Sequence, residues 1–186
     1  MPEFGVDRSS EAPLAILYRD EHIVVIDKPP NLLVHRSEID RHETRFAIQL
    51  LRDQIGRRVW PAHRLDRGTS GVLLFALSAE LAGVLGRQFE AGTVEKRYWA
   101  VVRGHPPAEG LIDHPLSRQR DAYEFQGDRC SQEAQAAVTR FRCLATTELP
   151  VMVDRYPSSR YALIELEPVT GRRHQLRRHL AHVSHP

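Results

Sequence analysis

The sequence predicts an α+β fold with a mixed, mainly antiparallel sheet and packed helices. Three observations support this prediction. Short apolar runs with β-branched residues recur along the chain, segments with apolar residues at helical spacing lie between some of them, and turn-forming residues separate the two kinds of segment. The chain has 186 residues, of which 41% are hydrophobic and 27% charged. We therefore expect one globular domain over residues 14–186, after a flexible leader over residues 1–13.

Two short strands are predicted at the start of this domain, over residues 14–18 and 22–27. Residues 20–21, Asp-Glu, form the expected turn between them. The second strand should end at the prolines of residues 29–30, because proline has no N–H group to donate to a neighbouring strand.

The next segments predict two helices on either side of a buried strand. Thr44 is expected to cap a helix over residues 45–56. The apolar run over residues 72–77 predicts a buried strand. Ser78 then provides an N-cap for a second helix, which Gly92 should end.

The second half of the chain predicts a strand-rich region and a last helix. Three further strands are expected, over residues 96–102, 138–144 and 161–167. The polar stretches 117–135 and 147–159 lack a clear period, so we expect irregular excursions there. The last helix is predicted over residues 173–183.

The most informative local pattern is the segment 63–71, His-Arg-Leu-Asp-Arg-Gly-Thr-Ser-Gly, which precedes the buried strand. Its single carboxylate, Asp66, lies among basic, hydroxyl and glycine residues. Nearby positive charge favours the ionised form of a carboxyl group, and an ionised carboxylate can act as a nucleophile or a base. The alternative is that this segment is only a turn, which its Asp, Ser and Gly residues also favour.

A second cluster lies at the last helix, where residues 171–179 read Gly-Arg-Arg-His-Gln-Leu-Arg-Arg-His. Arg173 and Arg177 are expected one turn apart, and Leu176 begins an apolar stripe toward the core. Such a helix can present arginines to a carboxylate or to phosphates. The alternative is an ordinary solvated basic face.

Composition narrows the classes of function. Of the 26 Lys and Arg residues, 24 are Arg, whose planar guanidinium grips phosphate, although coding bias also explains this excess. Two cysteines do not make a disulfide framework, and we find neither a signal peptide nor a membrane-spanning stretch, so a cytoplasmic protein is expected. His179 and His182 could share a helix face, but no Cys or acidic ligand stands near them, so no metal site is expected.

Tyr98 follows Lys96 and Arg97 on a predicted strand. Aromatic residues fit strands well, so taken alone this tyrosine is expected in the core.

Together these segments resemble the RluA-type pseudouridine synthase family. The resemblance rests on residues 63–71, 96–98 and 171–179, with the strand ending Asp-Lys-Pro at 27–29, all in the family's order. Residues 34–41 and 155–161 resemble the branch that modifies bacterial tRNA. In contrast to the family pattern, Arg173 stands where a small hydroxylic residue is usual, and the chain ends where relatives usually continue, which suggests a truncated C-terminus.

The resemblance implies the pseudouridine synthase catalytic fold, with an RNA-binding cleft across the sheet. It also implies that the chain isomerises a specific uridine of tRNA to pseudouridine, as a monomer, without a metal or organic cofactor. Asp66 corresponds to the family's catalytic aspartate. Arg177 corresponds to the arginine that pairs with it, and Tyr98 to the tyrosine that stacks on the target base.

Four further residues are expected to bind substrate. Arg64 matches the residue that fills the gap left by the flipped-out nucleotide, and Leu176 matches an apolar wall of the uracil pocket. His63 and Arg173 are expected to contact the RNA beside them. Two alternatives remain open, namely a synthase of the same chemistry that acts on rRNA, and an RNA-binding module without catalysis.

Overall fold

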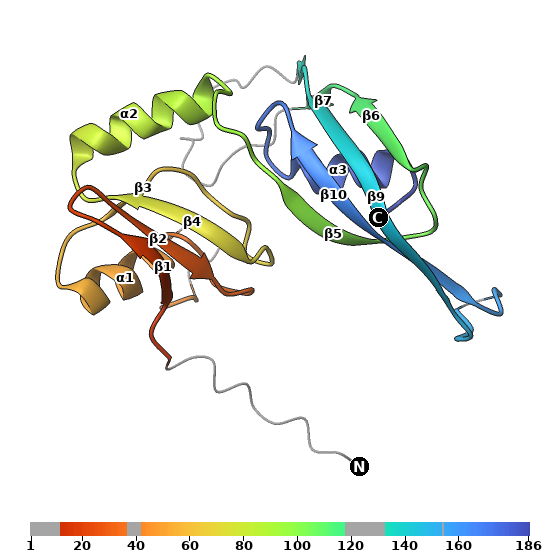
Figure 1. Ribbon diagram of the computed structural model, residues 1–186, viewed down its shortest axis with the longest axis horizontal. Helices are drawn as coiled ribbons and strands as arrows, with labels where there is room; N and C mark the ends of the chain where they lie inside the picture. Colours follow the sequence, from red (N-terminus) through yellow and green to blue (C-terminus); the bar gives the residue numbers. More distant parts are fainter. Residues whose placement is uncertain (1–11, 37–41, 118–132, 154) are drawn as a thin grey trace, which may run out of the picture. The chain divides into compact units, whose positions relative to one another are not determined.

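The computed structural model describes residues 12–36, 42–117, 133–153 and 155–186. Within it the chain divides into two compact units, Met1–Phe89 and Glu90–Pro186, and each is described by itself (Figure 1). The expected leader over residues 1–13 and the expected excursion over residues 117–135 fall mostly outside the described residues. The single catalytic domain over residues 14–186 stays a prediction.

A four-stranded sheet of order β1-β2-β4-β3 forms the centre of the first unit. Its strands are β1 (Ala15–Arg19), β2 (Ile23–Lys28), β3 (Trp60–Pro61) and β4 (Gly71–Ala76). Every pair within this sheet is antiparallel. The predicted strands over residues 14–18, 22–27 and 72–77 are therefore confirmed, each with a boundary shift of one residue.

The turn between β1 and β2 is built by Asp20, whose Oδ1 accepts hydrogen bonds from the backbone N–H groups of His22 and Ile23, both at 2.7 Å. A carboxylate that accepts two local N–H groups closes a tight turn without help from a glycine. The predicted turn at residues 20–21 is thus confirmed.

The core of the first unit lies between this sheet and helix α1 (Ala47–Ile55). Side chains alternate between the two faces of a strand, so one face of β2 and β4 is apolar and buried. The buried residues from these three elements are Val24, Ile26, Ala47, Leu51, Leu73 and Phe75. This packing holds the start of β4, and with it the segment around Asp66, on a rigid base.

The start of α1 differs from the prediction, because Thr44 does not cap it. The N-cap residue is Phe46, in an extended conformation, and its side chain has no atom that could accept a hydrogen bond. Instead the first two N–H groups of α1 donate to the backbone oxygens of Leu33, at 2.8 Å, and Val34, at 3.1 Å. A distant segment thus replaces the local cap. Gly56 ends the helix as predicted, at a φ of 65°.

Helix α2 (Ala79–Glu90) follows β4 directly. Ser78 caps it as predicted, because its Oγ accepts a hydrogen bond of 3.2 Å from the N–H of Leu81. None of the helices in the described part of the chain is long and apolar enough to cross a membrane.

The second unit contains a four-stranded antiparallel sheet of order β5-β10-β9-β6. Its strands are β5 (Tyr98–Arg103), β10 (Ser159–Pro168), β9 (Val138–Leu149) and β6 (Glu109–Asp113). The antiparallel pairing in both units confirms the predicted α+β class. Beside this sheet, β7 (Leu116–Ser117) pairs with β8 (Ala134–Gln135).

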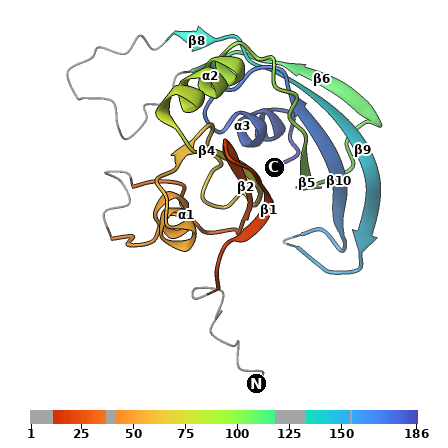
Figure 2. The same cartoon turned by 60° about the vertical axis from the view of Figure 1, so that its left-hand side comes forward.

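Helix α3 (Gln175–His182) packs against this sheet and completes the second core. Figure 2 shows the sheet curving around the helix. The buried core residues are Val102, Ala162, Ile164, Leu166 and Leu180. Three of them alternate along β10, as the sequence predicts.

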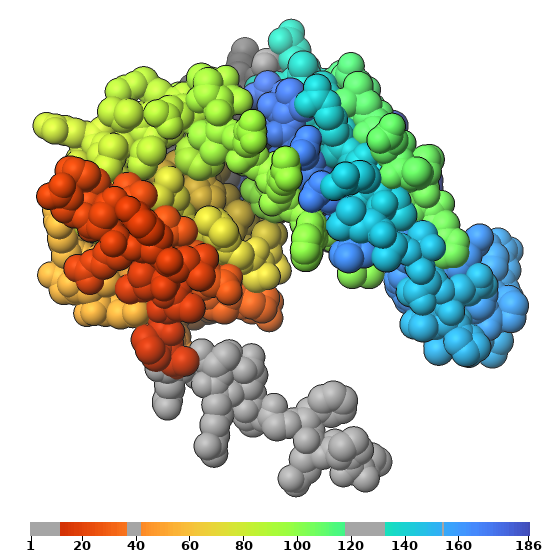
Figure 3. Space-filling model, viewed as in Figure 1, coloured from red at the N-terminus to blue at the C-terminus, as the bar shows by residue number. Residues whose placement is uncertain are grey.

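The predicted irregular excursion over residues 147–159 is wrong at its two ends, where residues 147–149 and Ser159 belong to strands. The pairing of β9 with β10 continues to Leu149 opposite Ser159. Described residues of β9 from Leu144 onward are exposed, and Figure 3 shows the tip of this hairpin standing out from the rest of the second unit. Because the end of β9 is exposed on both faces, its sequence carries no apolar alternation that would predict a strand.

Gly110 provides a test of this sheet. A methyl group added at Gly110 of β6 would lie 2.5 Å from Cε1 of Phe141, the residue paired with it on β9. We therefore expect Gly110→Ala to lower the free energy of unfolding by about 1–3 kcal/mol, because the ring must leave its place. Urea unfolding followed by circular dichroism measures this change. An Ala variant as stable as the wild type would contradict the packing of Phe141 over Gly110.

Candidate active site

Asp66 lies on a β-turn that leads into β4. The N–H of Thr69 donates to the backbone oxygen of Asp66 at 3.0 Å, which closes the turn over residues 66–69. The Asp66 side chain is exposed, whereas Leu73 and Phe75 of the following strand are fully buried. The segment is therefore a turn and also presents a carboxylate on a rigid strand, so the two interpretations of this motif are compatible.

His63 anchors the start of the Asp66 loop. Its ring stacks on Phe89 of α2, with a centroid distance of 4.7 Å. Its Nε2 accepts a hydrogen bond of 3.2 Å from the N–H of Leu74, so the neutral ring carries its proton on Nδ1. These contacts connect the loop to α2 and β4. The neighbouring Arg64 is exposed, and the substrate contacts expected of both residues stay predictions.

Lys28 lies beneath the Asp66 loop and is not among the functional residues predicted from the sequence. Lys28 is the last residue of β2 and is paired with Gly71, the first residue of β4. Its side chain is fully buried, and Nζ donates to the backbone oxygens of Pro29 at 2.9 Å, Leu32 at 2.8 Å and Arg67 at 3.2 Å. Each of the three ammonium N–H groups therefore has one carbonyl acceptor.

This buried ammonium group connects β2 to the residue that follows Asp66. Burial lowers the pKa of Lys28 from 10.5 to about 8, and the Asp66 carboxylate acts in the opposite direction. A sequence signal for this role exists, since Lys28 is one of only two lysines and ends a strand directly before two prolines.

An ion pair holds the outer side of the same loop. Nη2 of Arg67 lies 2.6 Å from Oε1 of Glu43, and both side chains are partly exposed. The Asp66 turn is thus held from below by Lys28 and from outside by Glu43.

The second unit carries the other predicted catalytic residues. Tyr98 begins β5, is half-buried and packs against the core. Leu176 of α3 packs against the same core, while Arg177, the next residue, is exposed. An apolar side chain and a guanidinium group therefore follow each other on one short helix.

The predicted relation between Arg173 and Arg177 is wrong. Helix α3 begins at Gln175, and His174 before it has a left-handed backbone with a φ of 53°. A left-handed residue interrupts the helical path, so Arg173 lies outside the helix and the one-turn spacing does not apply. Arg173 as a substrate-binding residue stays a prediction.

His179 is a structural histidine in this fold. It is fully buried, with Nδ1 at 2.9 Å from Oγ1 of Thr139 and Nε2 at 3.0 Å from the backbone oxygen of His114. Among the described residues no group of three or more His, Cys, Asp or Glu side chains could hold a metal ion.

The structure thus brings the predicted residues together in two sets. His63, Arg64 and Asp66 lie on one loop of the first unit, whereas Tyr98, Leu176 and Arg177 belong to the second. The expected ion pair of Asp66 with Arg177 stays a prediction.

Comparison with known proteins identifies the family of this chain. The family model described as RNA pseudouridylate synthase matches residues 22–182. The tRNA pseudouridine synthase C of Pasteurella multocida is 53% identical over 173 residues, which cover 93% of this chain and 71% of that protein. The proteins of the same name from Vibrio cholerae and Pectobacterium carotovorum are 49% and 50% identical over 93% of this chain, which spans 71% and 46% of their lengths.

Two solved structures of the same family share the fold of this chain. Human RNA pseudouridylate synthase domain containing 1 matches with a TM-score of 0.70 and 28% identity, over 93% of this chain and 66% of that one. The human domain containing 4 matches with a TM-score of 0.68 and 31% identity, over 92% and 66%. This chain therefore spans about two thirds of each human structure. With the family's motifs in order and a match over most of its length, the chain belongs to the RNA pseudouridylate synthase family.

Proposed function

We propose that this chain isomerises a uridine of tRNA to pseudouridine, with Asp66 as the reacting carboxylate. The observation that carries the proposal is the Asp66 turn. It presents an exposed carboxylate beside the buried ammonium group of Lys28, within the motif that the family shares. The alternative of an RNA-binding module without catalysis gives no reason for a carboxylate held in this way.

The reaction exchanges one bond of uridine for another. The bond between N1 and C1′ breaks, the base rotates, and a bond between C5 and C1′ forms. The C5 proton is released to solvent and N1 gains a proton, so no electrons are gained or lost and no redox cofactor is needed. An ionised Asp66 can add to C6, attack C1′ or assist formation of a glycal, and each path places it at the sugar–base junction.

The remaining site residues have complementary roles in this proposal. The target nucleotide must leave the RNA stack before its reacting atoms can be reached. Arg64 takes the vacated place, Tyr98 stacks on the uracil, and Leu176 provides an apolar wall. Arg177 pairs with Asp66 and orients its carboxylate, while His63 and Arg173 contact the RNA.

The proposed substrate is tRNA, because the curated relatives cited above carry the name tRNA pseudouridine synthase C. The chain also resembles the branch that modifies uridine 65, which makes this nucleotide the proposed target.

Binding of the tRNA should weaken as the salt concentration increases, because the proposed contacts join arginines to phosphates. The enzyme would act as a monomer in the cytoplasm, where tRNA is found.

Tritium release tests the proposal. Transcripts of tRNA and of 23S rRNA are prepared with tritium at C5 of uridine and incubated with the purified chain. We expect one equivalent of tritium to be released from each tRNA, and pseudouridine to map to position 65. Release from the rRNA transcript alone would favour the rRNA alternative. Binding of tRNA without any release would favour the non-catalytic alternative.

A further inference from the structure

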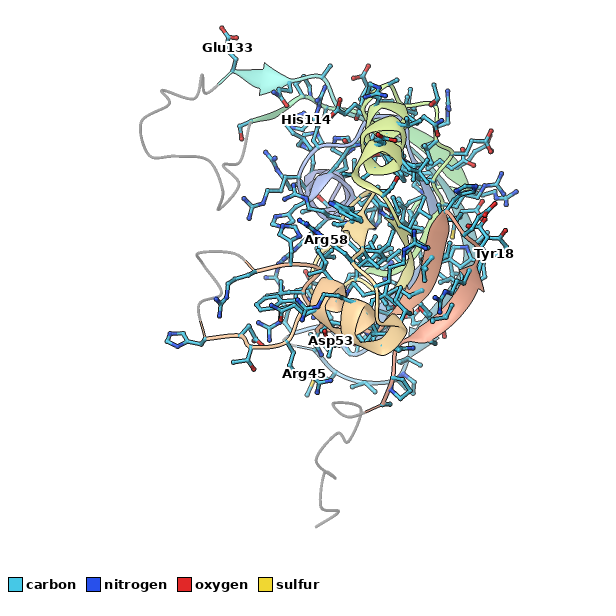
Figure 4. The ribbon with its side chains drawn as sticks, turned by 90° about the vertical axis from the view of Figure 1, so that its left-hand side faces the viewer. Tyr18, Arg45, Asp53, Arg58, His114 and Glu133 are labelled. Atoms are coloured by element: carbon cyan, nitrogen blue, oxygen red, sulfur yellow. The ribbon has the colours of Figure 1, made fainter. Side chains whose placement is uncertain are left out.

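A chain of buried hydrogen bonds connects α3 to β9. The Nε2 of Gln175 donates to Oγ1 of Thr139 at 3.0 Å and to the backbone oxygen of Val138 at 3.0 Å. Oγ1 of Thr139 also forms a hydrogen bond with Nδ1 of His179. Nε2 of His179 forms a hydrogen bond with the backbone oxygen of His114. Thr139 and His179 are fully buried, and His114 is labelled in Figure 4. We call Gln175, Thr139 and His179 the α3 relay.

With a neutral His179 ring, the hydrogen-bond partners fix the position of each polar hydrogen in the α3 relay. A backbone oxygen only accepts, so the Nε2 of His179 carries a proton. In the neutral ring Nδ1 is then an acceptor, and the hydroxyl of Thr139 donates to it. The lone pairs of Thr139 accept from the amide nitrogen of Gln175. Donors and acceptors alternate without a conflict along the whole relay.

The amide of Gln175 is fixed from its other side as well. Its Oε1 accepts from the hydroxyl of Thr170 at 2.7 Å and from the backbone N–H of Arg172 at 2.9 Å. A flipped amide would place its NH₂ group against the N–H of Arg172 and its oxygen against the carbonyl of Val138. The orientation of Gln175 is therefore set by backbone groups.

The α3 relay determines which way Arg177 points. Gln175 and His179 are four residues apart and share the buried face of α3, so Arg177, midway between them, lies on the opposite, exposed face. Helix α3 has only eight residues and no side-chain cap, so it depends on its contacts with the sheet.

We propose that Gln175, Thr139 and His179 are positioning residues that hold Arg177 and Leu176 in the orientation the reaction needs, as long as His179 is neutral. This inference rests on the proposed function. A protonated His179 would have a donor on both nitrogens, and the hydroxyl of Thr139 would lose its acceptor. The relay would then break at low pH.

The surroundings of His179 favour its neutral form. Burial lowers its pKa from the usual 6.5, and positive charge on His114, on the loop after β6, and on Arg178 and His182 of α3 acts in the same direction. The hydrogen bond to the His114 backbone opposes this shift, and β9 contributes the uncharged Thr139. The relay's contribution to stability is thus complete above pH 6.5 and is lost as pH falls through the lowered pKa.

Substitution of Thr139 tests this inference. Thr139→Val keeps the shape but removes the hydroxyl, whereas Thr139→Ser keeps it, and Thr146→Val changes an exposed threonine of the same strand. We expect Thr139→Val to lower kcat about 10- to 100-fold with the Kd for tRNA unchanged within about twofold. In a plot of kcat against pH, the fall on the acid side should move to higher pH in Thr139→Val, because neutral His179 has lost a hydrogen bond. Thr139→Ser should restore both, and Thr146→Val should match the wild type.

A second measurement does not depend on activity. Nitrogen-15 NMR of the wild-type chain should show His179 as the neutral tautomer with its proton on Nε2. A proton on Nδ1, or a Thr139→Val variant with wild-type kcat and wild-type pH dependence, would overturn the relay. If the wild type releases no tritium from any RNA, the proposed function fails, and the NMR signal still decides whether the relay exists.

Discussion

The Asp66→Asn variant is expected to release tritium from tRNA at least about 1,000-fold more slowly than the wild type. An amide has nearly the shape of a carboxylate but carries no negative charge and is a poor nucleophile. Because the Asp66 side chain is exposed and its backbone oxygen closes the turn, the fold should not change. Binding of tRNA, measured by filter retention, should stay within about twofold, since the proposed phosphate contacts come from arginines and not from Asp66.

A matched control separates this effect from a general loss of an acidic residue. Asp53, which Figure 4 labels on α1, is exposed and pairs with the neighbouring Arg52. Asp53→Asn should release tritium at the wild-type rate, because an exposed ion pair contributes little. Equal rates for wild type and Asp66→Asn would reject Asp66 as the reacting group.

The second large effect is expected at Lys28. Lys28→Met keeps a long apolar stem but removes the charge and all three donors, so the carbonyl of Arg67 loses its partner beside Asp66. A displacement of about 1 Å at a reacting group can lower turnover about 100-fold, and we expect a loss of this size at pH 7 with tRNA binding retained. Arg52→Met, which removes an exposed cation of the same unit, should keep wild-type turnover.

Lys28 also makes activity and stability depend on pH with opposite signs. Wild-type turnover should fall as pH rises through about 8, because a neutral amine has two N–H groups for three carbonyls. Over the same range the free energy of unfolding should rise, by about 3 kcal/mol between pH 8 and 10.5, because the unfolded chain retains the proton longer.

Both pH effects should be absent from Lys28→Met. The measurements are tritium release and urea unfolding at a series of pH values. If the turnover of Lys28→Met still falls as pH rises through about 8, another group titrates there. That result would contradict a role for the Lys28 charge beside Asp66.

Local patterns explain why much of the fold and the candidate site could be predicted. The alternation of Ala162, Ile164 and Leu166 indicates that one face of β10 is buried. The turn at Asp20 and the helix cap at Ser78 depend on hydrogen bonds to residues close in sequence. Prediction failed at the starts of two helices, once because a distant segment acts as the cap and once because one residue leaves the helical conformation. The carbonyls of Leu33 and Val34 replaced the expected cap at Thr44, and the left-handed His174 separated Arg173 from α3.

The sequence by itself determined the α+β class, the strands with one apolar face, and the Asp66 motif with its order relative to Tyr98 and Arg177. Only the tertiary structure decided that Lys28 lies under the Asp66 loop and that Thr139 meets His179. Lys28 and Arg67 are 39 residues apart, and Thr139 and His179 are 40 apart. A buried polar group needs a partner, but which partner it finds depends on how strands and helices pack, and no local pattern carries that information.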